Sequence, residues 1–251
     1  MNLELFIARR IAHNGSGNRP GVMVRIAVVA VALSVTVMIL ALAVIMGFKR
    51  EITDRVTGFS AQVEVADLRS AGSIESVPVL RSEQLERTIR SAGEVVRLTP
   101  YAVKGGVVKT PDAILGVMLK GVDGGYEWSF FRDHLLEGEL PRVGDSIRTK
   151  EILISRSVAR EMGLVPGDKV EMLFVESEKS PRRDRFKVSG IYATGMDEFD
   201  RSVAMTDLRN VQRLADWSSE EVSGYEVTLA DFLQAEDFSR RLNDMLLDSD
   251  R

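Results

Sequence analysis

Cysteine is absent from this chain of 251 residues, and histidine occurs only twice, at His13 and His134. Disulfide bonds are therefore excluded, and the thiolate and imidazole ligands of a zinc site are missing. Packing alone must hold the fold together. A domain of about 200 residues is long enough to bury a core that does so.

A strong excess of charge of one sign is also missing. The chain has 33 Lys and Arg against 37 Asp and Glu, which leaves a formal net charge of −4. A protein whose main partner is nucleic acid needs a concentrated basic surface. The composition therefore argues against nucleic acid as a partner.

Catalytic motifs are missing as well. The sequence has no Gly-x-Ser-x-Gly, no His-Glu-x-x-His, no Walker sequence and no Gly-x-Gly-x-x-Gly after a strand. Asp197, Glu198 and Asp200 form a small cluster, for which a turn between strands is the simpler interpretation and a cation site the alternative. His134 follows Asp133, but adjacent helical residues point apart, which favours a surface histidine over an acid–base pair. We expect no enzyme, no metal ligands and no cofactor.

Only one long apolar run is present, and it lies near the N-terminus. Residues Ile26–Phe48 carry no charge and, at about 1.5 Å per residue, span about 34 Å, more than the bilayer core of about 30 Å. The charged residues before it are mainly basic: Arg9, Arg10, Arg19 and Arg25 against Glu4. This excess predicts a cytoplasmic N-terminus and an external domain. A cleaved signal peptide is the alternative, but its apolar core has about 7–15 residues.

The run divides the chain into three predicted parts. Residues 1–21 form a cytoplasmic segment, in which apolar residues at helical spacing indicate a short amphipathic helix at the membrane surface. Residues 22–48 form the transmembrane helix, and residues 49–251 form the external domain. Within the span, small residues share one side of the helix and indicate a helix–helix contact: Ala27, Ala30, Ser34 and Ala41.

Beyond the span, period-two strands alternate with short helices, which predicts an α+β fold in two subdomains. The strands are expected at 62–66, 95–98, 102–109, 113–121, 151–155, 169–175, 185–193, 203–206 and 224–229. The helices are expected at 82–92, from 156 to Gly163, at 207–215 and at 232–247. Residues 126–136 fit either a helix or a packed loop.

A charged segment, Glu176–Arg185, separates two of these strands. It is much longer than the two-residue turn that such a hairpin needs, and Pro181 stiffens its centre. A long charged loop either has no particular role or projects toward a partner. The sequence leaves both interpretations open.

Seven short motifs, in this order and spacing, resemble one known family. They are Ile7-Ala-Arg-Arg10, Met46-Gly-Phe-Lys-Arg-Glu-Ile52, Leu119-Lys-Gly-Val-Asp123, Glu151-Ile-Leu-Ile-Ser155, Met162-Gly-Leu-Val-Pro-Gly-Asp168, Phe186-Lys-Val-Ser-Gly-Ile191 and Asp200-Arg-Ser-Val-Ala-Met205. The chain resembles the lipoprotein-releasing permeases of bacterial ABC transporters (LolC and LolE type), within the superfamily of MacB- and FtsX-like permeases. The resemblance implies a MacB-like periplasmic domain after the first transmembrane helix. It also implies that the chain is a fragment or a truncated reading frame, because family members have three more helices.

The resemblance further implies a mechanism and a set of partners. Two permease subunits, identical or related, sit in the bacterial inner membrane with two copies of a separate ATPase, which binds the ATP. Acylated lipoproteins enter from the membrane lipid between the first helices and pass to a periplasmic chaperone. In this picture the side chains expected to touch acyl chains are Met38, Leu42, Ile45 and Met46. The alternative is that this stripe faces bulk lipid.

A protruding hairpin recruits the chaperone in one family member. The loop at 177–185 falls in the equivalent place, so the resemblance implies a hook role for Pro181, Arg182 and Arg183. Two other functions stay open. One is a MacB- or FtsX-type permease, which serves efflux or activates a cell-wall hydrolase, and the other is a stand-alone membrane-anchored binding domain.

Overall fold

The computed structural model describes residues 6–7, 22–59, 61–70, 76–111, 113–144, 147–176 and 179–249. The chain divides into two compact units, Met1–Asp54 and Arg55–Arg251. Most of the predicted cytoplasmic segment, 1–21, lies outside the described residues.

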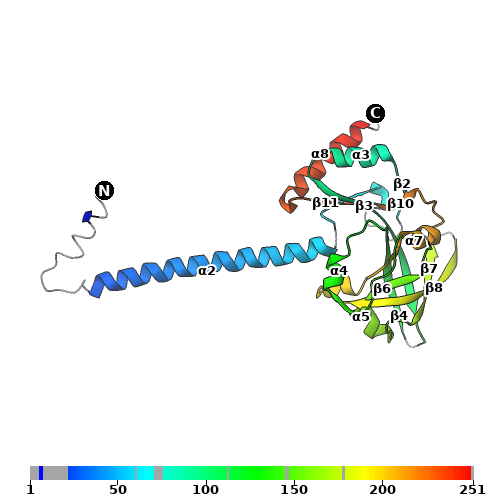
Figure 1. Cartoon of the computed structure of the whole chain (residues 1–251), viewed down its shortest axis with the longest axis horizontal. Helices are drawn as coiled ribbons and strands as arrows, with labels where there is room; N and C mark the ends of the chain where they lie inside the picture. The colour runs from blue at the N-terminus through cyan, green and yellow to red at the C-terminus, as the bar shows by residue number, and fades with distance from the viewer. Residues whose placement is uncertain are drawn as a thin grey trace. The chain divides into compact units, whose positions relative to one another are not determined.

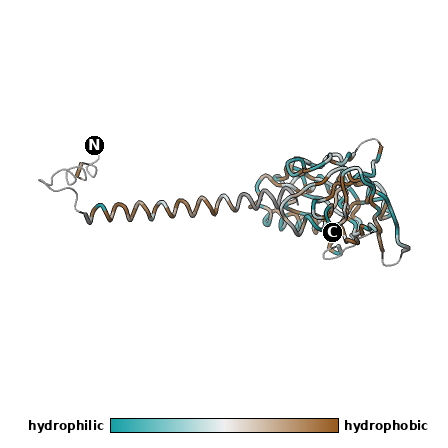
Figure 2. The backbone as a smooth tube through the Cα atoms, turned by 90° about the horizontal axis from the view of Figure 1, so that it is seen from below, coloured by the Kyte–Doolittle hydropathy of each residue, from teal (hydrophilic) through white to brown (hydrophobic). Residues whose placement is uncertain are grey.

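The long helix α2 runs from Val22 to Phe59 (Figure 1). Its stretch Val24–Phe48 is long and apolar enough to cross a membrane, by length and composition, and none of that stretch is buried. Figure 2 shows this stretch as predominantly hydrophobic. The hydroxyl groups of Ser34 and Thr36 donate hydrogen bonds to carbonyls one turn earlier, at 2.9 and 2.8 Å. A lipid-facing helix needs such internal partners for its polar groups.

In the described part of the second unit, nine strands form one sheet. They are β1 (Val63–Ala66), β3 (Val95–Lys109), β4 (Ile114–Val122), β5 (Leu135–Gly138), β6 (Glu151–Ser155), β7 (Lys169–Glu176), β8 (Lys179–Tyr192), β9 (Val203–Asp207) and β11 (Gly224–Leu229). Six of them close into a ring, because β3 pairs β4, β4 pairs β9, β9 pairs β6, β6 pairs β8, β8 pairs β7, and β7 pairs β3. The strands β11 and β1 extend this barrel from β3, and β5 extends it from β8. A separate pair joins β2 (Val79–Leu80) to β10 (Glu221–Val222).

The strand β3 corrects one expectation. The sequence predicts two runs, at 95–98 and 102–109, because Pro100 interrupts them, but the structure has one strand. The carbonyl of Tyr101 accepts from the Ser223 N–H on the β11 side, so the ring nitrogen of Pro100 points to the opposite edge. Pairing with β4 begins only at Tyr101, and the missing N–H therefore breaks no ladder bond.

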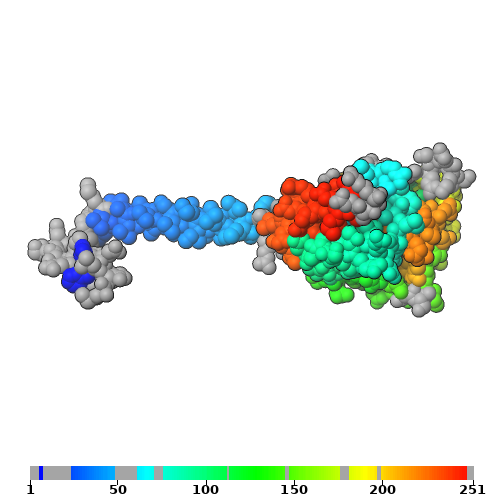
Figure 3. Space-filling model, turned by 90° about the horizontal axis from the view of Figure 1, so that it is seen from above, coloured from blue at the N-terminus to red at the C-terminus, as the bar shows by residue number. Residues whose placement is uncertain are grey.

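Capping residues set the helix boundaries close to those predicted. Ser82 caps α3 (Glu83–Ser91), Ser155 caps α5 (Arg156–Met162) and Asp207 caps α7 (Leu208–Leu214). Gly163, with φ of 65°, ends α5 in the left-handed region. The last helix, α8 (Ala235–Ser249), follows a short 3₁₀ turn, η2 (Phe232–Gln234). Figure 3 shows α8 and α3 side by side on one face of the second unit.

The remaining elements are short: η1 (Leu68–Ser70), α4 (Ser129–Asp133) and α6 (Asp197–Asp200). The segment 126–136, left open by the sequence, contains α4 and the start of β5.

Two apolar clusters lie against the sheet. The larger one fills the barrel and the space under α3 and α8, with Phe174, Phe186 and Phe238 among its buried side chains. The smaller one is centred on Phe131 and Tyr192, whose ring centroids are 5.1 Å apart. The structure confirms the α+β class, whereas the further division into two subdomains stays a prediction.

Candidate functional site

The four side chains predicted to contact acyl chains lie on α2 and are all exposed. Met38, Leu42, Ile45 and Met46 have exposed fractions between 52% and 64%. The neighbouring apolar residues of the helix are exposed to a similar degree. The exposure fits lipid contact and helix contact equally, so the role of these residues stays a prediction.

The charged segment 177–185 is not a long loop, which corrects the sequence-based expectation. The strand β8 begins at Lys179, so only residues 177 and 178, which lie outside the described residues, separate it from β7. Arg182 pairs with Phe174 across the ladder, and Arg183 pairs with Leu173. Pro181 falls at an irregularity in the pairing, where a proline is tolerated. The charges and the proline indicated a loop, but both are also typical of an exposed edge strand.

The tip of this hairpin extends past its neighbours in the sheet. Pairing of β7 with β3 ends at Leu173, and pairing of β8 with β6 begins at Lys187. Residues 174–176 of β7 and 179–182 of β8 pair only with one another in the described part of the sheet. A projecting hairpin is therefore present at the predicted place, although it is shorter than expected.

A cluster of charges, which we call the Asp184 cluster, holds the root of the hairpin. The Asp184 carboxylate is 7% exposed and accepts hydrogen bonds from Lys150, from Arg213 on α7 and, at 2.8 Å, from the N–H of Arg185. Burial acts to raise the pKa of Asp184. The bonds from Lys150 and Arg185 and the charge of Arg213 outweigh that effect and hold the pKa below its usual range.

Arg182 is part of the same attachment. Its guanidinium donates to the Asp216 carboxylate and, at 3.3 Å, to the Arg213 carbonyl at the end of α7. Asp216 has a φ of 59°, which is unusual for a residue other than glycine. The structure thus brings Arg182 to α7, whereas Arg183 points the other way and is 73% exposed.

The outward side of the hairpin is basic, and we call it the hairpin face. Cross-strand pairing places its charged residues on one side of β3, β7 and β8: Lys109, Lys169, Arg183, Arg185, Lys187 and one acid, Glu171. Exposed apolar side chains lie beside them, with Val175 at 58% and Ile114 at 68%. Among the described side chains on this side of the three strands, five cations lie beside one carboxylate, in contrast to a chain of net charge −4. Lys169 and Lys187 lie directly opposite each other, an arrangement that destabilises a sheet.

A second charged group, the Lys120 cluster, was not predicted from the sequence. Lys120 on β4 is 8% exposed, and its Nζ lies 2.5 Å from the Glu226 carboxylate on β11. The same Nζ lies 5.9 Å from the ring centroid of Tyr101 and 5.8 Å from that of Tyr126. Tyr101 donates its hydroxyl hydrogen to Glu64 on β1. The only sequence signal was a lysine within an otherwise apolar strand.

Glu64 and Glu226 are directly opposite each other in the β1–β11 ladder. Burial raises the pKa of Glu64, the charge of Glu226 raises it further, and Lys120 lowers it in part. One cation thus balances two carboxylates.

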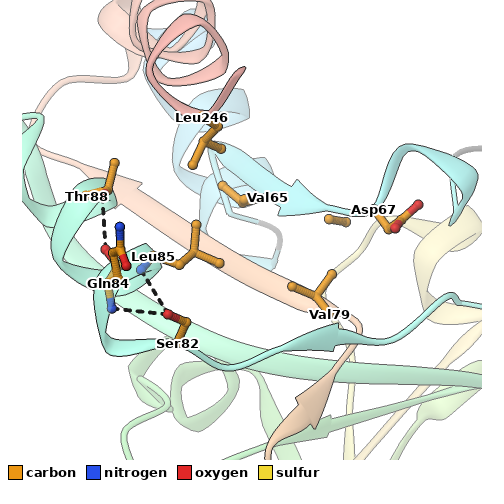
Figure 4. A pocket seen from close by; sticks show the side chains of 9 residues that line it. Val65, Asp67, Val79, Ser82, Gln84, Leu85, Thr88 and Leu246 are labelled. Atoms are coloured by element: carbon orange, nitrogen blue, oxygen red, sulfur yellow. Dashed lines mark hydrogen bonds between the residues drawn. The ribbon is translucent and has the colours of Figure 1, made fainter. Parts of the chain in front are cut away.

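A groove lies beside the edge strand β1. It has a volume of about 470 Å³ and lies between β1, β2, α3 and the end of α8 (Figure 4). Val65, Val79, Leu85 and Leu246 make it apolar, and its rim is polar but nearly uncharged. The side chains that line it pack against one another, and Ser82 caps α3, so the described residues of the groove present no reactive groups.

His134, the acid–base candidate, and Asp200, from the candidate cation cluster, both have structural roles. The His134 ring nitrogen Nδ1 lies 2.8 Å from the Phe130 carbonyl, and its ring stacks on Phe130. Asp200 is buried and accepts hydrogen bonds from the Thr194 backbone and hydroxyl. Within the described residues no group of three or more His, Cys, Asp or Glu is placed to hold a metal ion.

Fold and site together define an α+β domain without a catalytic centre in its described part, preceded by a helix able to span a membrane. The chain belongs to the family of the MacB-like periplasmic core domain, which matches residues 26–245. The family consists of periplasmic domains of ABC permeases and is not catalytic.

Two relatives carry the same name. The lipoprotein-releasing system transmembrane protein LolC of Xylella fastidiosa (strain 9a5c) is 27% identical over 224 residues, which are 83% of this chain and 50% of the relative. LolC of Neisseria meningitidis serogroup B is 26% identical over 201 residues, 76% of this chain and 45% of the relative. The chain thus spans about half the length of these relatives. Among solved structures, the periplasmic region of MacB from Actinobacillus actinomycetemcomitans has a TM-score of 0.47 at 15% identity, and covers 73% of this chain and 79% of that one.

Proposed function

We propose that the chain forms part of a permease subunit of an ABC transporter that releases lipoproteins from the inner membrane to a periplasmic chaperone. The LolC relatives, which match most of this chain, support the choice of substrate. A separate ATPase and a second permease subunit complete the transporter. The α2 helix would be one wall of the path for acyl chains, with Met38, Leu42, Ile45 and Met46 on the lipid side.

The hairpin face is the single observation that carries the chaperone step. It joins an excess of positive charge to exposed apolar side chains at a projecting hairpin. Such a face suits a soluble protein with an acidic rim around an apolar opening, because complementary charge speeds the encounter and apolar contact adds affinity. Arg183 would contact the chaperone, whereas Arg182 would hold the hairpin on α7, and Pro181 would stiffen the tip.

Lipoprotein release in proteoliposomes tests this proposal. The complete permease is reconstituted with its ATPase, an acylated lipoprotein and the soluble chaperone, and the transferred lipoprotein is measured. We expect the charge reversal Arg183→Glu with Arg185→Glu to lower transfer at least tenfold and to leave ATP hydrolysis unchanged. The matched control, Arg87→Glu with Arg90→Glu on α3, should transfer normally.

Two results would contradict the proposal. Normal transfer by the hairpin variant would remove the hairpin face from the chaperone step. A wild-type transporter that hydrolyses ATP but releases no lipoprotein would favour a MacB- or FtsX-type function.

Lipid contact by α2 has its own test. Photo-crosslinkers at Leu42 and Ile45 should capture the acylated lipoprotein, and a crosslinker at Ala30 should capture protein helices instead. Capture of helices alone from all three positions would exclude the lipid-path role.

A further inference from the structure

A second groove lies between α5 and the edge strand β5, and none of the residues that line it belongs to the hairpin face or to the two charge clusters. Its volume is about 550 Å³. Apolar side chains from both elements and from neighbouring β8 line it: Leu136, Ala159, Leu164, Val165 and Ile191. Two of them are clearly exposed, Val165 at 55% and Leu136 at 43%. The groove therefore presents apolar surface to solvent.

Two arginines line the same groove without partners. Arg156 and Arg160 are one turn apart on α5, and both are exposed. Neither has a carboxylate or carbonyl partner among the described residues. Arg156 is also the first residue of α5, whose first turn contains no acidic side chain. A cation at this position interacts unfavourably with the helix dipole, so the charge of Arg156 does not stabilise α5.

The strand β5 adds a free edge. It is the last strand in the order of the sheet and pairs only with β8 in the described part of the sheet. An edge of this kind carries backbone N–H and C=O groups that an incoming strand can pair with.

We propose that this groove binds an extended acidic segment of a partner protein. The spacing of the two arginines on α5 matches the spacing of alternate side chains on an extended strand. Residues four apart on a helix rise by about 6 Å, and alternate residues of a strand are about 6.6 Å apart. An acidic–x–acidic–x–apolar segment would therefore set its two carboxylates on Arg156 and Arg160 and its apolar side chain against Leu164 and Val165.

Glu137 sets a further condition on the segment. It lies on β5 at the same groove and is the only acid that lines it among the described residues. Like charges directly opposite each other in a ladder are unfavourable. The residue opposite Glu137 must therefore be uncharged or basic, which excludes a uniformly acidic stretch.

Peptide binding to the full chain in phosphatidylcholine nanodiscs tests this inference. The probes are fluorescent, end-blocked Thr-Asp-Thr-Asp-Thr-Leu-Thr and the same sequence reversed, because the structure allows either strand direction. A third peptide carries Asn in place of both Asp. Fluorescence anisotropy at low salt should show binding of at least one Asp peptide, at least tenfold tighter than the Asn peptide.

Variants separate the groove from general electrostatics. Arg156→Ala with Arg160→Ala should weaken binding at least tenfold without lowering the unfolding temperature. Arg87→Ala with Arg90→Ala on α3 should bind as the wild type does. Equal binding by both double variants, or no binding of either Asp peptide, would overturn the inference. A thermal stabilisation by phosphatidylglycerol nanodiscs that needs Arg156 and Arg160, without peptide binding, would assign the groove to a lipid and overturn it equally.

Discussion

The Lys120 cluster and the Asp184 cluster each balance a nearly buried charge, but with opposite signs. In the first, one nearly buried cation balances two carboxylates on β1 and β11. In the second, one buried carboxylate balances two cations, from Lys150 and from α7. Each joins elements that are distant in the sequence. The comparison shows that the sign of the surplus charge decides how each junction responds to pH.

The two clusters also join different parts of the fold. The Lys120 cluster ties β1, the first strand after α2, to β4 of the barrel. The Asp184 cluster ties the hairpin to α7. If the hairpin face binds the chaperone, the second junction sets the direction of the binding surface, whereas the first one joins the strand that follows α2 in the sequence to the barrel.

Removal of the cation should have the largest effect. Lys120→Met leaves Glu226 and Glu64 opposite each other without a positive charge, and we expect a loss of about 3 kcal/mol in unfolding free energy at pH 7. Urea unfolding of the full chain in detergent, followed by tryptophan fluorescence, measures it. Adding Glu226→Gln should recover part of the loss. A double variant as unstable as Lys120→Met alone would show that the charge balance is not the cause.

Removal of the central carboxylate should have a smaller effect. Asp184→Ala leaves Lys150 and Arg213 unpaired, but both cations are about half exposed and regain water. We expect a loss of about 2 kcal/mol. The same unfolding experiment measures it. The exposed Asp133→Ala is the control and should stay within about 0.5 kcal/mol of the wild type.

Acid should weaken the Asp184 cluster. The folded pKa of Asp184 lies below its usual range, so the stabilising contribution is present above the unfolded pKa of about 3.9 and is lost as the pH falls through the folded value. The stability difference between wild type and Asp184→Asn should therefore shrink below about pH 4. A difference that is constant from pH 7 down to the acid transition would contradict this.

The Lys120 cluster should respond in the opposite direction, with the smallest effect. The folded pKa of Glu64 is raised, so the protonated form is favoured by folding, and that stability is lost as the pH rises through the folded value. Glu64→Gln should stabilise the protein by about 0.5 kcal/mol at pH 7, because it removes a cross-strand repulsion. The gain should vanish in acid. A destabilised Glu64→Gln at pH 7 would show that the Tyr101 bond outweighs the repulsion.

Local signals in the sequence predicted the helices and most strands well. Ser82 and Asp207 cap the helices that they were expected to start, because a cap acts on the next few residues only. The alternating run Gly224–Leu229 is a strand with the predicted bounds. Such features need no information from distant parts of the chain.

The errors arose where distant residues decide the structure. Pro100 does not interrupt β3. Its ring nitrogen points toward the β4 side, where pairing begins only at Tyr101, so no ladder hydrogen bond is lost. The charged residues from Lys179 onward belong to the strand β8. They are held there because the Asp184 carboxylate accepts hydrogen bonds from Lys150 and Arg213, which are far away in the sequence. Closure of the barrel and both charge clusters depend in the same way on register, which a single sequence does not contain. The lipid and chaperone contacts stay predictions, because they depend on partners.

Photo-crosslinking at the hairpin tests the central claim most directly. In the complete transporter, a photoreactive residue in place of Arg183 should capture the soluble chaperone, and one in place of Arg90 on α3 should not. Asp184→Ala should reduce the capture at position 183, because the hairpin loses its attachment to α7. Absence of the chaperone from the products at position 183, or equal capture at positions 183 and 90, would contradict the account.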